Sequence, residues 1–126
     1  MSTPDPMAEE VVLDEAALLA EVGGDVFELR DRVDGFLRDS PRRLAEIAKA
    51  LDSATRRMIE REAHTLAESA RRLSGRRAAA AALRLEQASQ TGSLQEAGVA
   101  YAAVAEEVRK LQLALSDLVS EHAAPA

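Results

Sequence analysis

The pattern that decides the fold lies in residues 93–119, which read SLQEAGVAYAAVAEEVRKLQLALSDLV. Ser93 and Glu96 have the spacing of a capping box, so we expect a helix to begin at this point. Apolar residues then recur at intervals of three and four, which is the period of one helix face. A helix with one long apolar face must bury that face against other elements. The residues of the face are Leu94, Ala97, Tyr101, Val104, Val108, Leu111, Leu115 and Leu118.

The N-terminal half predicts two helices. A short one is expected over residues 13–22, stopped by the glycines at 23–24, and it is too short to be stable alone. Asp25 can cap a second helix, whose apolar residues keep the spacing of three and four. Ser40 and Pro41 interrupt this run. Serine is a good cap and proline fits a first helical position, so the pair either begins a new helix or kinks a continuing one.

Two further helices are expected in the middle of the chain. Asp52 or Ser53 can cap the third, and Gly75 is expected to stop it. The fourth covers roughly residues 76–90, is rich in alanine and ends at Gly92. Its only large apolar residues are Leu83 and Leu85.

These elements predict the fold class. No run alternates with period two, and connections of one to four residues imply antiparallel neighbours. The 126 residues fit one domain. We therefore expect an all-α fold, an antiparallel up-down four-helix bundle with a short additional N-terminal helix, over residues 12–120. Residues 1–11 and 121–126 are expected to be flexible tails.

Composition excludes several classes of function. The formal net charge of −6 disfavours binding to nucleic acid or to an anionic membrane. No stretch approaches the ~20 apolar residues of a membrane span and no secretion signal begins the chain, so a cytoplasmic location is expected. Cysteine is absent, which removes thiol nucleophiles and thiolate metal sites. No phosphate-binding loop, dinucleotide fingerprint or nucleophile elbow is present, so nucleotide hydrolysis and acyl transfer have no support.

His64 is the residue on which a chemical function can rest. The only other histidine, His122, falls in the expected C-terminal tail. The centre of the third helix's apolar stripe lies about 150° around the axis from His64, so the imidazole should face solvent. Two alternatives stay open, a histidine packed in the core and an exposed histidine with no role.

The face around His64 carries charges that suit a phosphoryl group. Arginines bind phosphoryl oxygens bidentately and attract carboxylate-rich partners, although a solvated face of ion pairs is the alternative. Either neighbouring glutamate could accept a hydrogen bond from Nδ1–H and leave Nε2 nucleophilic. One histidine without a thiolate does not make a metal site, so none is expected. The residues that share this face are Arg57, Glu60, Arg61, Ala67, Glu68 and Arg71.

Three segments resemble one known family. Residues 63–70, AHTLAESA, are similar to the A-H-x-L-K-G-[SA]-[SA] signature of histidine-containing phosphotransfer (HPt) domains. Residues 21–25, EVGGD, and residues 36–44, FLRDSPRRL, resemble the amino-terminal half of that family, with matching spacing to His64. The resemblance covers roughly residues 12–119.

The resemblance implies a four-helix bundle with a solvent-facing phospho-accepting histidine, here His64. It implies transfer of a phosphoryl group from an aspartyl phosphate on a receiver domain and onward in a two-component phosphorelay. The implied partners are a response-regulator receiver domain, a hybrid histidine kinase, or both. The domain would be a phosphotransfer intermediate without kinase activity of its own, and it would need no cofactor, because the receiver supplies magnesium.

Two positions depart from the signature. The family's lysine is Ala67 here, and its glycine is Glu68. A carboxylate ~5 Å from a phosphoryl group, at an effective dielectric of ~20, opposes it by roughly 3 kcal/mol per unit charge. Arg61 and Arg71, within one to two turns of His64, could offset much of this repulsion.

Two other functions remain open. The first is a degenerate HPt-like module that binds a receiver or kinase domain without phosphotransfer. The second is a structural helical interaction module, dimerising through the long last helix with His64 incidental. The same apolar stripe is needed to fill a monomer's core, so a monomer is expected.

Overall fold

The computed structural model describes residues 11–123 and contains five helices within them. They are α2 (Glu15–Glu21), α3 (Val26–Asp52), α4 (Arg56–Arg72), α5 (Arg76–Thr91) and α6 (Leu94–Ala123). Most of the expected N-terminal tail and residues 124–126 lie outside the described range. The C-terminal boundary differs from the expectation, because α6 continues past residue 120 and includes His122.

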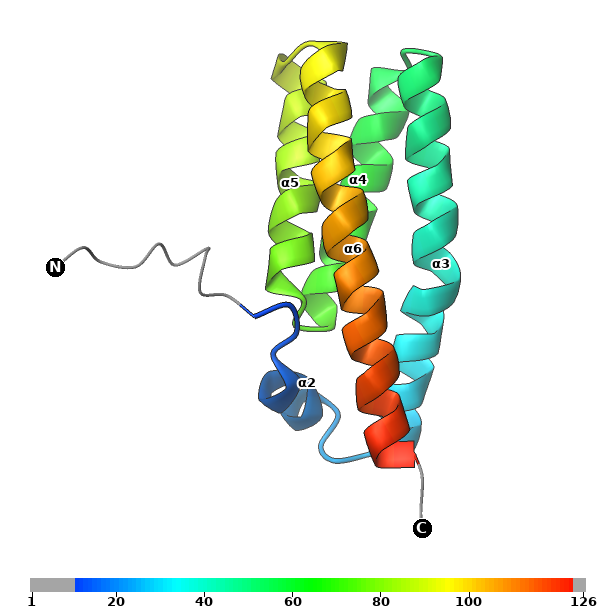
Figure 1. The fold of residues 1–126 in the computed structure, drawn as a ribbon, viewed down its shortest axis with the longest axis vertical. Helices are drawn as coiled ribbons and strands as arrows, with labels where there is room; N and C mark the ends of the chain where they lie inside the picture. Colours follow the sequence, from blue (N-terminus) through cyan, green and yellow to red (C-terminus); the bar gives the residue numbers. More distant parts are fainter. Residues whose placement is uncertain (1–10, 124–126) are drawn as a thin grey trace, which may run out of the picture.

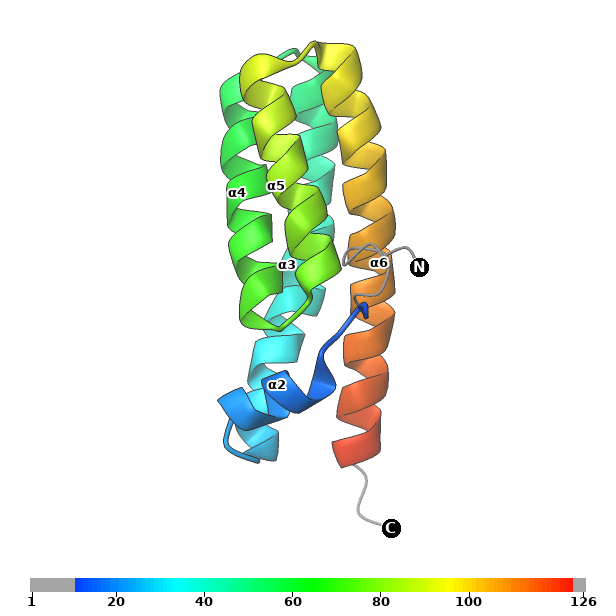
Figure 2. The same cartoon turned by 90° about the vertical axis from the view of Figure 1, so that its left-hand side faces the viewer.

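The four long helices form the expected antiparallel bundle (Figures 1 and 2). Each packs against two neighbours, in the order α3, α4, α5, α6 and back to α3. Helices α3 and α6 extend beyond the ends of α4 and α5, and α2 fills the space left there (Figure 2). Leu18 of α2 is fully buried in the common core. The all-α bundle with an additional short N-terminal helix is therefore confirmed.

Helix α3 is continuous through the serine-proline pair, which settles the alternative left open by the sequence. Asp25 caps it as predicted, because its carboxylate accepts from the backbone N–H groups of Phe27 and Glu28. Pro41 lies inside the helix, and the preceding Ser40 is buried. The Ser40 hydroxyl donates to the carbonyl of Phe36, 2.6 Å away. A polar side chain thus satisfies backbone next to the position where proline removes a helical hydrogen bond.

The expected start of the third helix was wrong. Helix α3 runs through Asp52 and is capped at its C-terminus by Ser53, so neither residue begins α4. The N-cap is Thr55, which follows Ala54 in a left-handed conformation with φ of 56°. Asp52 and Ser53, which the sequence offered as N-caps, instead form the C-terminal end of α3.

Gly75 does not stop α4 as expected, because the helix ends at Arg72 and Gly75 is the N-cap of α5. Ser74, with φ of 60°, makes the turn instead. Gly75 is buried against the bundle, and a Cβ atom there would lie 2.5 Å from Cδ2 of Leu111. The glycine therefore permits a close approach to α6 rather than a positive φ.

The core is aliphatic. Ala78, Ala81, Ala82 and Leu85 form the buried face of α5, whereas Leu83 is 48% exposed. The stripe predicted in α6 is buried at Ala97, Val104, Val108, Leu111, Leu115 and Leu118. Because these side chains fill this bundle's own core, they offer nothing to a second copy.

Polar contacts join the helices at the edge of the core. Arg43 pairs with Glu62 across α3 and α4 at 2.9 Å. The Tyr101 hydroxyl donates to the Leu44 carbonyl, and burial raises its pKa, so it remains a donor. None of the helices in residues 11–123 is long and apolar enough to cross a membrane.

Candidate functional site

His64 lies midway along α4 on the face opposite the core. The buried residues of this helix are Ile59, Ala63, Leu66 and Ala70. The His64 side chain is 59% exposed, as its angle from the apolar stripe predicts. A packed core histidine is therefore excluded, and the imidazole is accessible to a partner.

The Nδ1 atom of His64 is held by a carboxylate from the neighbouring helix α5. It lies 3.3 Å from Oε1 and 3.2 Å from Oε2 of Glu86. A carboxylate accepts but does not donate, so the contact favours the tautomer with its proton on Nδ1. The Glu86 side chain is only 17% exposed, which limits competition from water. In that tautomer the lone pair is on Nε2, and within residues 11–123 no hydrogen bond to Nε2 is found.

The expectation that Glu60 or Glu68 orients His64 was wrong. The Glu60 carboxylate accepts from Nε2 of Gln90, 2.9 Å away on α5. Glu68 forms an ion pair and hydrogen bond with Arg71, three residues on. Neither carboxylate forms a hydrogen bond with the imidazole among the described residues. Glu86 was missed because only neighbours on the same helix were considered, although its place on the adjoining helix was a usable signal.

A third contact sets how α4 and α5 pair. The Arg56 guanidinium donates to the carbonyls of Ser89, at 3.1 Å, and Gly92, at 2.8 Å. A cation at the carbonyl end of α5 is favourably placed for the helix dipole. Together the polar contacts cross what we call the α4–α5 seam, formed by Arg56, Glu60 and His64 on α4 with Glu86, Ser89, Gln90 and Gly92 on α5.

Two of the predicted arginines share a shallow surface hollow with His64. This His64 hollow has a volume of about 340 Å³. Within residues 11–123, neither Arg57 nor Arg61 pairs with a carboxylate, and the one hydrogen bond that the Arg61 side chain donates is to Sδ of Met58 at 3.7 Å. Arg71, by contrast, is engaged by Glu68 and does not line the hollow. The lining residues are Arg57, Glu60, Arg61, His64, Thr65 and Glu86.

The two signature departures have different surroundings. Ala67 is half-buried and packs against the edge of the core. Glu68 directs its carboxylate to the guanidinium of Arg71. Neither residue lines the His64 hollow. The added negative charge is therefore partly neutralised where it stands.

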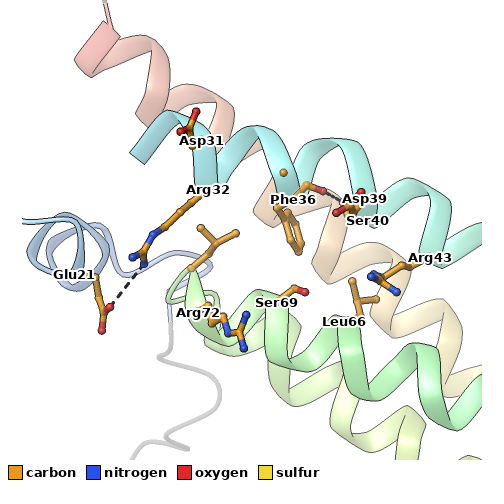
Figure 3. A pocket seen from close by; sticks show the side chains of 12 residues that line it. Glu21, Asp31, Arg32, Phe36, Asp39, Ser40, Arg43, Leu66, Ser69 and Arg72 are labelled. Carbon is orange, nitrogen blue, oxygen red and sulfur yellow. Dashed lines mark hydrogen bonds and ion pairs between the residues drawn. The ribbon is translucent and has the colours of Figure 1, made fainter. Parts of the chain in front are cut away.

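A larger hollow of about 560 Å³ lies on another side of α4 (Figure 3). It is bounded by α3, by the C-terminal half of α4 and by α2, whose Glu21 faces Arg32 at 3.8 Å. Charges of both signs line it, and none of the predicted site residues does. In residues 11–123, no group of three His, Asp or Glu side chains is arranged to hold a metal ion.

Comparison with known proteins agrees with this arrangement. The Hpt domain family model matches residues 32–121, which include nearly all of the four-helix bundle and His64. No curated protein and no solved structure in the comparisons matches the chain significantly. Members of the matched family act in histidine phosphotransfer and interact with receiver domains and kinases of two-component systems. Since the match extends over more than two thirds of the chain, the protein belongs to the Hpt domain family.

Proposed function

We propose that His64 accepts a phosphoryl group from the aspartyl phosphate of a receiver domain and passes it to another aspartate in a phosphorelay. The observation that carries this proposal is that the two ring nitrogens of His64 have different surroundings. Nδ1 is engaged by Glu86, the imidazole as a whole is 59% exposed, and the tautomer favoured by this contact has its lone pair on Nε2. A nucleophile with a fixed proton and an accessible lone pair is what the reaction needs.

The transfer step follows from that geometry. The Nε2 lone pair attacks phosphorus, the N–P bond forms, and the P–O bond to the receiver's aspartate breaks with its electron pair going to the carboxylate. The proton stays on Nδ1, so the phosphorylated ring carries positive charge that the Glu86 carboxylate stabilises. The reverse attack by a second aspartate completes the relay. The chain contributes the nucleophile and its orientation, and the family resemblance assigns magnesium to the receiver.

The charge at Glu68 opposes this reaction less than the sequence suggests. Its carboxylate is paired with Arg71, and it stands outside the hollow beside the nucleophile. The roughly 3 kcal/mol per unit charge expected for an unpaired carboxylate is therefore an upper bound. The proposal also includes a receiver or a hybrid kinase as partner, a monomeric state and a cytoplasmic location.

The test is a phosphotransfer assay with phosphorylated receivers. Labelled phosphate should move from a cognate receiver to this protein, and His64→Gln should abolish the labelling because amide nitrogen is not a nucleophile. The control is His122→Gln, which removes the only other histidine and should leave labelling unchanged. Absence of label with several cognate receivers, or loss of label in the control alone, would rule the proposal out.

A second candidate is binding without transfer, which the replacement of the family's lysine and glycine by Ala67 and Glu68 favours. In that case a receiver should bind equally well to the wild type and to His64→Ala. No acid-labile phosphate should form on either. Calorimetry of binding, run beside the transfer assay, separates this function from phosphotransfer.

A further inference from the structure

We propose that Arg61, assisted by Arg57, binds the phosphoryl group on His64 and so replaces the cation that the chain lacks at position 67. This inference rests on the proposed phosphotransfer function and deepens it. It assigns the electrostatic part of the site to the N-terminal side of His64. The family signature instead places its lysine on the C-terminal side.

The direction of the imidazole is the first argument. Nδ1 faces Glu86 on α5, and Nε2 lies on the other edge of the ring. A phosphoryl group on Nε2 therefore extends away from α5, over the surface of α4. The cations that can reach it must stand on that side of the helix.

Helical geometry places the two arginines there. At 100° per residue, Arg61 lies about 60° and Arg57 about 20° from His64 around the axis, both turned away from the α5 side. Glu60 lies about 40° from His64 in the opposite sense around the axis. Because Glu60 contacts Gln90 of α5, that sense points toward α5 and the arginines lie on the other side. Arg61 is also three residues from His64, a spacing at which Cβ atoms are about 5–6 Å apart.

Availability is the second argument. Arg56 and Arg71, the nearest alternatives on α4, are engaged by the Ser89 and Gly92 carbonyls and by Glu68. Within the described chain the Arg61 guanidinium donates a hydrogen bond only to a thioether, and Arg57 pairs with no carboxylate. Both arginines line the His64 hollow, whereas Arg71 does not. An anion entering the hollow meets two guanidinium groups that form no ion pair. They offset the Glu60 and Glu86 carboxylates, which line the same hollow and contact Gln90 and His64.

The experiment uses the full chain phosphorylated on His64 by phosphoramidate, so that no receiver is needed. A ³¹P NMR titration then gives the apparent pKa of the phosphoryl group. Arg61→Gln should raise that pKa by about half a unit, the effect of one charge ~5 Å away in a nearly aqueous setting. Arg57→Gln should raise it by less. Arg61→Lys should retain most of the wild-type value, because the charge is kept.

The matched control is Arg109→Gln, an exposed arginine on α6 that Glu106 already engages and that lies outside the site. It should leave the phosphoryl pKa unchanged. A change in Arg109→Gln equal to that in Arg61→Gln, or no change in either, would overturn the inference.

Failure of this inference can be told from failure of the proposed function. If receivers phosphorylate His64 but Arg61→Gln changes neither the pKa nor the transfer rate, only the role of Arg61 is refuted. If no receiver transfers phosphate while the chemically phosphorylated protein still shows the pKa shift, phosphotransfer is refuted and the anion site stands. Circular dichroism of each variant confirms that the helices remain intact.

Discussion

The two nitrogens of His64 have different surroundings, and the difference comes from a residue 22 positions away. Glu86 contacts Nδ1 from α5, while the ring itself is largely exposed. Such a contact fixes both the tautomer and the orientation of an imidazole. The reactivity of this side chain is thus set by the helix beside it as well as by its own.

Replacing Glu86 should weaken the nucleophile without unfolding the bundle. In Glu86→Ala the proton is free to move to Nε2, and we expect transfer to fall about tenfold, a typical effect of losing an orienting partner. The measurements are the rate of labelling from a phosphorylated receiver and the ¹⁵N NMR tautomer ratio of His64.

Glu86→Gln serves as the partial variant, because its amide oxygen still accepts from Nδ1 but carries no charge. Glu60→Gln is the control, since that carboxylate contacts Gln90 instead of His64. A tautomer ratio that is the same in Glu86→Ala and the wild type would contradict the orienting role.

Among the elements, α5 is held closest to its neighbours by small residues. Its buried face is built from three alanines, a single leucine and Ser89. At its start, Gly75 lies where a Cβ would collide with Leu111 of α6. The backbone of α5 can therefore approach α6 closely. On its other side, α5 makes the polar contacts of the α4–α5 seam.

Gly75→Ala should destabilise the bundle, whereas the same change at Gly98 should not. The added Cβ at position 75 lies 2.5 Å from Cδ2 of the fully buried Leu111, and overpacking of this kind costs about 1–3 kcal/mol. At Gly98, within α6, the added Cβ meets nothing within 4 Å. Alanine there should stabilise by roughly 0.5–1 kcal/mol, because it has the higher helix propensity.

Urea unfolding of the wild type, Gly75→Ala and Gly98→Ala measures the free energy of unfolding of each protein. Since each variant adds the same methyl group, the sign of the difference separates packing from propensity. Equal changes in both proteins would show that the close approach at Gly75 is not what the structure indicates.

For the molecule as a whole, the sequence predicted what helical periodicity controls. The α6 stripe and the exposure of His64 follow from residues three and four apart, and both were confirmed. The start of α4 at Thr55 was missed because Asp52 and Ser53 are also good caps, and the choice depends on how far α3 extends. Glu86 was missed because its contact depends on how two helices pair.

The stripe that fills the core also bears on oligomeric state. The six residues of α6 from Ala97 to Leu118 that form the inner face are fully buried within one chain. We expect light scattering to give the mass of a single chain across micromolar concentrations. A stable dimer of folded chains would contradict this expectation, because its interface would have to be a surface other than the buried inner face of α6.

The seam between α4 and α5 has one more consequence. In the proposed transfer, the Nδ1 proton of His64 is positioned by an atom from a separate helix, so a chain in which α5 has not docked still carries the imidazole but lacks its orienting acceptor. If His64 accepts phosphate as proposed, its competence to do so is tied to completed assembly of the bundle. Nascent or partly unfolded molecules would compete poorly for activated receivers, and little of the signal would be lost to them.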